Sequence, residues 1–160
     1  MSVPVVAAPL PGRVVADFTL PSTGKEEFHL RAQRGHNVVL YFYPRDDTPG
    51  CTLEGQDFQR LLPAFMRAGT RVFGVSRDTL AAHQKFCGKF GFEFALLADE
   101  SGAVCTQFDV IRMKNMYGRK VMGIERSTFL IDALGKLRRE WRKLKVTGHA
   151  AEVLEAAKAL

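Results

Sequence analysis

The chain has 160 residues, of which 46% are hydrophobic and 25% are charged, which is typical of a soluble protein that buries its core in a single domain, here residues 1–160. No apolar run approaches the roughly 20 residues that a membrane-spanning helix needs. The formal net charge is +6. Much of the excess lies in residues 136–145, which we interpret as a solvated basic face and not as a nucleic-acid site.

The first elements predicted along the chain are a hairpin, a strand and a long helix. Residues 15–20 and 26–32 are predicted to pair as a short N-terminal hairpin. Residues 36–44 contain a continuous apolar run that fits a central strand buried on both faces. Residues 49–68 carry apolar side chains at helical spacing. Pro63 should kink this helix or end its regular part, because proline lacks the N–H that the helix needs.

The later elements alternate strands and helices and then close with a hairpin and a helix. They are a strand at 71–76, a helix at 78–91, a strand at 92–99, a short helix at 101–108, paired strands at 125–132 and 137–144, and a helix at 149–160. Asp78 is the predicted N-cap of the second long helix. This order predicts an α/β protein with a mixed central sheet flanked by helices. It matches the thioredoxin-like pattern with an N-terminal hairpin extension.

One cysteine falls at the predicted start of the first long helix. Thr48 can cap that helix, Pro49 is favoured at its first position, and Gly50 lets the backbone approach a ligand. Cys51 then lies in the first turn, where unpaired N–H groups and the helix dipole stabilise an anion. We therefore expect Cys51 to be a reactive thiolate at neutral pH.

The neighbouring residues exclude several thiol chemistries. A dithiol oxidoreductase would have a second cysteine where Glu54 stands, and a cysteine phosphatase would have arginine in place of Asp57. No local signature supports a histidine base of the papain type. His83 and Cys87 could share a helix face, but two ligands are a weak indication of a metal site. We interpret them as a surface histidine and an ordinary helix cysteine, and expect neither metal nor cofactor.

The pattern P-x-x-x-T-x-x-C, formed by Pro44, Thr48 and Cys51, resembles that of the peroxiredoxins. Four ordered blocks resemble the peroxiredoxin Q branch, also called bacterioferritin comigratory protein. They read "YFYPRDDTPGCTLE", "GVSRDTLAAHQKFCGKFGFEFALLADE", "GIERSTFLID" and "WRKLKVTGHAAEVLEAAKAL". The resemblance covers nearly the whole chain and implies a thiol-dependent peroxidase of the antioxidant type.

The resemblance also implies a role for each matching residue. Cys51 would attack the O–O bond of a hydroperoxide, and Thr48 would hydrogen-bond the peroxide and the sulfur. Arg126 would hold the thiolate and stabilise charge on the leaving oxygen. Pro44 would shield the site from water. Glu54, one turn after Cys51, could pair with Arg126 and orient it.

Oxidation would leave Cys51 as a sulfenic acid that a second thiol condenses into a disulfide. Many relatives carry this resolving cysteine at the position of Gln56, so the commonest arrangement of the branch is ruled out. The resemblance favours Cys87, on the following long helix, and Cys105 reads as a small buried hydrophobe. A one-cysteine mechanism stays open. Since two separate helices hold the thiols apart, we expect the turns after Thr48 and part of the Cys87 helix to unwind.

The remaining expectations concern partners and location. The resemblance implies recycling by thioredoxin or a similar dithiol protein, and an internal resolving thiol favours a monomer. The N-terminus has no basic residue before Arg13 and is interrupted by prolines, unlike a secretory signal, so we expect a cytoplasmic protein.

Phe42, Phe92 and Phe94 are predicted to be core residues. The rival interpretation is a thioredoxin-fold binding or chaperone protein with an incidental thiol.

Overall fold

The structure is a computed structural model that describes residues 8–160, apart from the side chain of Met116. The first part of the N-terminal stretch, on which the expectation of no secretory signal depends, lies outside the described residues. Within residues 8–160, no helix has both the length and the apolar character that crossing a membrane would require.

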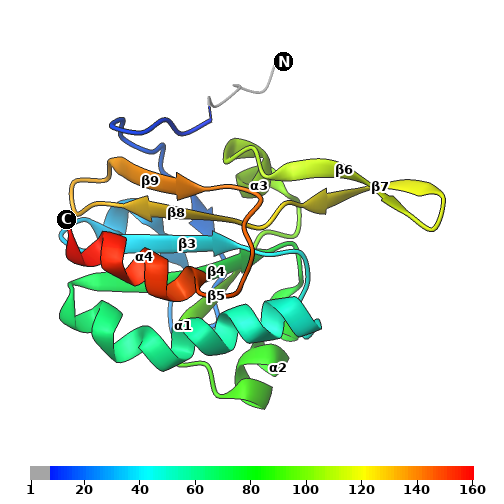
Figure 1. The fold of residues 1–160 in the computed structure, drawn as a ribbon, viewed down its shortest axis with the longest axis horizontal. Helices are drawn as coiled ribbons and strands as arrows, with labels where there is room; N and C mark the ends of the chain where they lie inside the picture. The colour runs from blue at the N-terminus through cyan, green and yellow to red at the C-terminus, as the bar shows by residue number, and fades with distance from the viewer. Residues whose placement is uncertain (1–7) are drawn as a thin grey trace.

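A five-stranded mixed sheet forms the centre of the molecule (Figure 1). Its strands, in spatial order, are β5 (Ala95–Ala98), β4 (Thr70–Ser76), β3 (Asn37–Phe42), β8 (Ser127–Ile131) and β9 (Leu137–Trp141). Strands β5, β4 and β3 run parallel, whereas β8 pairs antiparallel with both β3 and β9. The predicted mixed α/β architecture is confirmed.

Helices cover both faces of this sheet. On one face lie α1 (Pro49–Arg67), α2 (Leu80–Phe90) and α4 (His149–Lys158), whose apolar side chains form one buried cluster. The short α3 (Ala103–Gln107) and the N-terminal segment cover the other face and form a second cluster. Figure 1 shows α1 and α4 lying side by side along the sheet.

The central strand β3 contributes to both clusters. Val38, Leu40 and Phe42 belong to the cluster under α3, and Val39 and Tyr41 to the cluster under α1. Alternate side chains of a strand point to opposite faces, so a continuous apolar run is what a strand covered on both sides needs. The prediction from the sequence is confirmed, and the chain leaves β3 at the edge where α1 begins.

Helix α1 passes through Pro63 and continues to Arg67. Of the two outcomes predicted for this proline, an end of the regular helix is therefore wrong. The physical reason is tertiary packing, because Phe58, Leu62 and Phe65 are all buried along the same face. Burial of such side chains is worth about 1.5–3 kcal/mol each, which offsets the lost hydrogen bond.

The predicted cap of α2 is wrong by one residue. Thr79 is the N-cap, and its hydroxyl accepts a hydrogen bond from the Ala82 N–H at 3.1 Å. Asp78 instead accepts hydrogen bonds from the Ser76 hydroxyl and from the Asp46 N–H. Both side chains are good caps, so the sequence alone could not choose between adjacent positions.

Two hairpins differ from expectation. The N-terminal one is confirmed but short, with β1 (Thr19–Leu20) and β2 (Phe28–His29) followed by a 3₁₀ turn at Leu30–Gln33. A second hairpin, β6 (Ile111–Met116) and β7 (Arg119–Ile124), was not predicted. It projects from the body (Figure 1), so neither face supplies the alternating burial by which strands are recognised.

The basic segment 136–145 contains the edge strand β9. Arg138 and Arg139 are exposed there and pair with Asp132 and Glu152 at 3.3 and 3.7 Å. Such pairs contribute little to stability, but charged side chains protect an edge strand from pairing with another chain. This arrangement agrees with the predicted solvated basic face.

His149, the first residue of α4, is a titratable side chain in the core. The side chain is buried, and Nε2 lies 2.8 Å from the Thr128 hydroxyl. Burial lowers the pKa of His149 to about 4 from an ordinary 6.5, with Glu152 opposing and Arg126 adding to the shift. The neutral ring is therefore the form that the folded state favours.

We predict that this histidine weakens the fold as the pH falls from about 7 to about 5. A lowered pKa gives stability that is present at neutral pH and lost as the unfolded chain takes up the proton, about 2 kcal/mol over this interval. Denaturant unfolding of wild-type and His149→Gln protein at both pH values measures the effect. Glutamine can still bond Thr128 but does not titrate, so parallel pH dependences would contradict the prediction.

Candidate active site

The candidate site lies where the loop after β3 enters α1. Thr48 is the N-cap by its backbone, with an extended conformation and a 2.8 Å hydrogen bond from the Thr52 N–H to its carbonyl. We had expected the Thr48 hydroxyl to cap the helix, but it makes no hydrogen bond to the first turn of α1. It donates instead to the Arg45 carbonyl at 2.9 Å. A hydroxyl that donates in this way keeps its oxygen lone pairs available to accept a hydrogen bond from a ligand.

Three of the predicted site residues meet in one hydrogen-bonded group. Arg126, which directly precedes β8, donates from Nη1 to Glu54 Oε1 at 2.6 Å and from Nη2 to Cys51 Sγ at 3.4 Å. Cys51 and Glu54 are 2% and 1% exposed, and the Arg126 side chain is 17% exposed. Arg126 thus lies against Cys51, as the resemblance implied, and the expected pairing of Glu54 with Arg126 is confirmed.

Gly50 makes room for the guanidinium. A Cβ at this position would lie 3.2 Å from Arg126 Nη2, which is closer than nearly all side-chain contacts of this kind. The absence of a side chain at Gly50 thus allows Arg126 to lie over the first turn of α1 and reach the sulfur. The sequence had suggested that a ligand approaches the backbone at Gly50, whereas the group that lies close to Gly50 in the structure is the Arg126 guanidinium.

The charges of this group depend on burial. Burial raises the pKa of Glu54 to about 7, although Arg126 opposes the shift. Burial alone would lower the pKa of Arg126, but the neighbouring Glu54 and Cys51 raise it. The guanidinium therefore stays charged at neutral pH, and a negative sulfur at Cys51 would be its second partner besides Glu54.

The other two predicted residues lie in the loop after β3 and on α2. Pro44 is exposed, two residues after the end of β3. Cys87 lies on α2, half-buried, with Sγ 3.8 Å from the Thr23 hydroxyl, and lines a hollow of about 240 Å³. Burial raises the pKa of Cys87, with Thr23 opposing and Asp46 adding to the shift. All three cysteines are free thiols, and Cys87 packs against the buried cluster that contains Cys51.

Cys105 lies on the opposite face of the sheet. It is fully buried in the cluster under α3, where its N–H bonds Asp99 at 2.7 Å. Burial raises the pKa of this thiol well above the ordinary value. The prediction of a small buried hydrophobe is confirmed, and the sheet separates Cys105 from Cys51.

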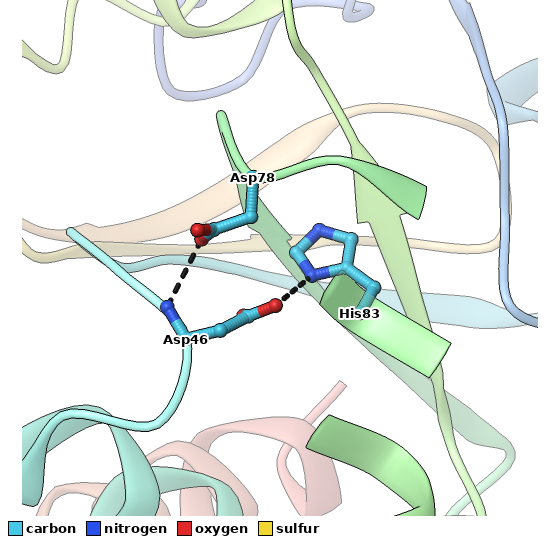
Figure 2. Close-up of side chains that lie close together, drawn as sticks. All are labelled: Asp46, Asp78 and His83. Carbon is cyan, nitrogen blue, oxygen red and sulfur yellow. Dashed lines mark hydrogen bonds and ion pairs between the residues drawn. The ribbon is translucent and has the colours of Figure 1, made fainter. Parts of the chain in front are cut away.

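A second polar group beside the site was not predicted. Asp46, in the loop before Thr48, and Asp78 gather around His83 of α2 (Figure 2). His83 is fully buried, so its interpretation as a surface histidine is wrong. The only signal of this burial in the sequence was the position of His83 among apolar residues at helical spacing on α2. These three side chains could approach a cation, but the His83 nitrogens already face Asp46 and the Leu97 carbonyl.

Gly55 is predicted to be intolerant of a side chain. A Cβ there would lie 2.5 Å from Cζ of the buried Phe92 ring. Overpacking of this kind costs about 1–3 kcal/mol, so we expect Gly55→Ala to lower the free energy of unfolding despite alanine's better helix propensity. Gly88→Ala is the matched control, because nothing lies within 4 Å of its Cβ. Equal unfolding free energies for the two variants would contradict this prediction.

Known proteins resemble this chain in sequence and in fold. The AhpC/TSA family matches residues 11–140. Peroxiredoxin Bcp of Xanthomonas campestris is 54% identical over 143 residues, 89% of each chain, and Peroxiredoxin Bcp of Bacillus subtilis is 43% identical over 147 residues, 92% of this chain and 94% of the relative. The solved Xanthomonas campestris peroxiredoxin Q has a TM-score of 0.86 at 50% identity over 98% of each chain. These similarities confirm the thioredoxin-like fold that the sequence predicted.

Proposed function

Because the chain belongs to the AhpC/TSA family and, within it, to the peroxiredoxin Q branch, we propose that it reduces hydrogen peroxide and organic hydroperoxides through Cys51. The observation that carries this proposal is the guanidinium of Arg126, which contacts both Cys51 Sγ and the Glu54 carboxylate. One charged group thus touches the sulfur and is fixed in orientation by a second, buried partner. A solved structure of the Xanthomonas campestris bacterioferritin comigratory protein concerns alkyl peroxide reduction, which supports the same substrate class here.

The first chemical step uses the residues around Cys51. The thiolate attacks one peroxide oxygen, an S–O bond forms as the O–O bond breaks, and the departing oxygen takes a proton to become water or an alcohol. Cys51 becomes a sulfenic acid. Arg126 stabilises the thiolate and the charge that develops on the departing oxygen, while the Thr48 hydroxyl accepts a hydrogen bond from the peroxide. Pro44, beside this loop, shields the sulfur from water.

The second step uses Cys87 as the resolving thiol. Its sulfur attacks the Cys51 sulfenic acid, an S–S bond forms, and the sulfenic oxygen leaves as water. Cys87 packs on the same face of the sheet as Cys51, whereas Cys105 packs on the other. Two solved Xanthomonas structures carry serine at cysteine positions whose separation equals that of Cys51 and Cys87. Since the thiols lie on different helices, the turns after Thr48 and part of α2 unwind to let them meet.

The cycle closes when thioredoxin or a similar dithiol protein reduces the disulfide, and no metal or other cofactor takes part. We propose a monomer that acts as an antioxidant enzyme in the cytoplasm. An internal disulfide supports a monomer, because resolution then needs no second subunit.

Treatment of the reduced protein with one equivalent of hydrogen peroxide tests this function. Disulfide mapping by mass spectrometry should find a peptide that joins Cys51 to Cys87, with Cys105 still free. Cys51→Ser protein is the blank and should consume no peroxide. An oxidised Cys51 beside a free Cys87 would indicate a one-cysteine peroxidase. No rapid oxidation of Cys51 would favour the binding or chaperone protein.

A further inference from the structure

Asp46 is anchored by three separate elements. Its Oδ1 accepts a 2.6 Å hydrogen bond from the hydroxyl of Tyr43, the residue that follows β3. Its Oδ2 lies 2.6 Å from His83 Nδ1 on α2, and its N–H donates to Asp78 Oδ2 at 3.0 Å, as Figure 2 shows for the last two contacts. The loop that carries Thr48 is therefore fastened to α2 and to the segment after β4.

The contact between Asp46 and His83 is a charge-assisted one. Nε2 of His83 lies 2.9 Å from the Leu97 carbonyl, so both ring nitrogens face oxygen acceptors. A hydrogen bond that joins a ring nitrogen to a carboxylate oxygen is stronger than one between two neutral groups. His83 is fully buried and the Asp46 side chain is 6% exposed. Such a pair is strong while it is intact and costly to leave half-made.

This pair joins the two parts of the molecule that the reaction must separate. Asp46 lies two residues before Thr48, and His83 lies one helical turn before Cys87. Asp47, between Asp46 and Thr48, has a φ of 58°, a conformation that a side chain adopts at some cost and that fixed neighbours maintain. An exposed pair, Lys89 with Asp47 at 2.8 Å, lies outside the buried one.

We propose that Asp46 and His83 form a latch that holds the Thr48 loop against α2 in the peroxide-reactive conformation, and that opening of this latch precedes disulfide formation. The inference rests on the proposed function and adds a step to it. Neither residue touches the reacting atoms, so both are positioning residues. While the latch is closed, Cys51 faces Arg126 and Cys87 is held on α2. Once it opens, the loop and α2 move independently and the sulfurs can meet.

The latch affects which of two reactions consumes the Cys51 sulfenic acid. A Cys51 sulfenic acid either forms the disulfide or reacts with a second peroxide to give sulfinic acid. A weaker latch favours the disulfide, because α2 opens more often. It also slows the first oxidation of Cys51, because the Thr48 loop is less often in place.

Asp46→Ala and Asp46→Asn provide the matched test. Alanine removes the latch, whereas the asparagine amide can donate to Nδ1 of a neutral His83 and keep the contact without charge. In reduced Asp46→Ala protein, amide exchange in α2 should rise about tenfold to a hundredfold, the effect of losing a charged hydrogen bond. Exchange in α4 should not change. With excess hydrogen peroxide, the ratio of disulfide to sulfinic acid should rise, and Asp46→Asn should stay near wild type.

Several results would overturn the latch. One is an Asp46→Ala protein whose amide exchange and product ratio both match the wild type. Another is an equal rise of amide exchange in α2 and α4, which would indicate general loosening of the fold. If Asp46→Ala does not fold, His83→Leu replaces it, because leucine cannot hydrogen-bond Asp46, and an unchanged product ratio there would be equally decisive. Failure of the proposed function is seen separately, because wild-type Cys51 would then not be oxidised by one equivalent of peroxide.

Discussion

Cys87→Ser protein should reduce one equivalent of hydrogen peroxide at the wild-type rate and then stop. Its Cys51 would remain a sulfenic acid, because Cys87 is no longer there to condense with it, and only a second equivalent of peroxide would carry it to sulfinic acid. Turnover with thioredoxin as reductant should fall to about a hundredth of the wild-type rate or less, since the disulfide that a dithiol attacks never forms. Single-turnover and steady-state assays on the same preparation separate the two effects.

The matched control is Cys105→Ala. This thiol is buried under α3, across the sheet from Cys51. We expect the alanine variant to keep both the single-turnover rate and the steady-state rate. If Cys105→Ala lost turnover and Cys87→Ser kept it, the assignment of the resolving thiol would be reversed. If neither lost it, the reductant would attack the sulfenic acid directly, as in a one-cysteine mechanism.

The sequence predicted the elements whose burial is regular. The apolar run of β3 and the helical spacing in α1 gave correct elements, because each packs on a large apolar surface. The hairpin of β6 and β7 was missed, because most side chains of β7 are exposed whichever face of the strand they are on. Its turn, with positive φ at Tyr117 and Gly118, is of the kind that joins two strands directly. Tyr117 occupies the first turn position, where asparagine, aspartate or glycine would have indicated a hairpin turn.

The site was predictable where the family pattern fixes residues and not where the contacts are long-range. The pattern selected Thr48 and Cys51, which are close in the sequence, and Arg126, which is distant in the sequence but contacts Cys51 in the structure. The His83 contacts could not be found, because a histidine is neither clearly buried nor clearly exposed by type. Its partners Asp46 and the Leu97 carbonyl come from a loop and a strand that only the folded sheet brings to α2.

Arg126→Ala should slow the oxidation of Cys51 by hydrogen peroxide about a hundredfold to a thousandfold, the usual cost of removing one preorganised donor from a developing negative charge. The loss has two origins. Less of the sulfur would be thiolate, and the departing oxygen would lack its cation. Alkylation of Cys51 by iodoacetamide as a function of pH reports the first alone, and the rate of oxidation by peroxide reports both.

Arg126→Lys distinguishes charge from geometry. The arginine contacts Glu54 and Cys51 through two different nitrogens, whereas a lysine ammonium is a single point that cannot hold the same planar arrangement. We therefore expect the lysine variant to recover much of the thiolate but little of the peroxide rate. Arg139→Ala, at an exposed arginine on β9, is the control and should react like wild type. If Arg126→Lys reacted as fast as wild type, positive charge alone would suffice and the fixed guanidinium would lose its role.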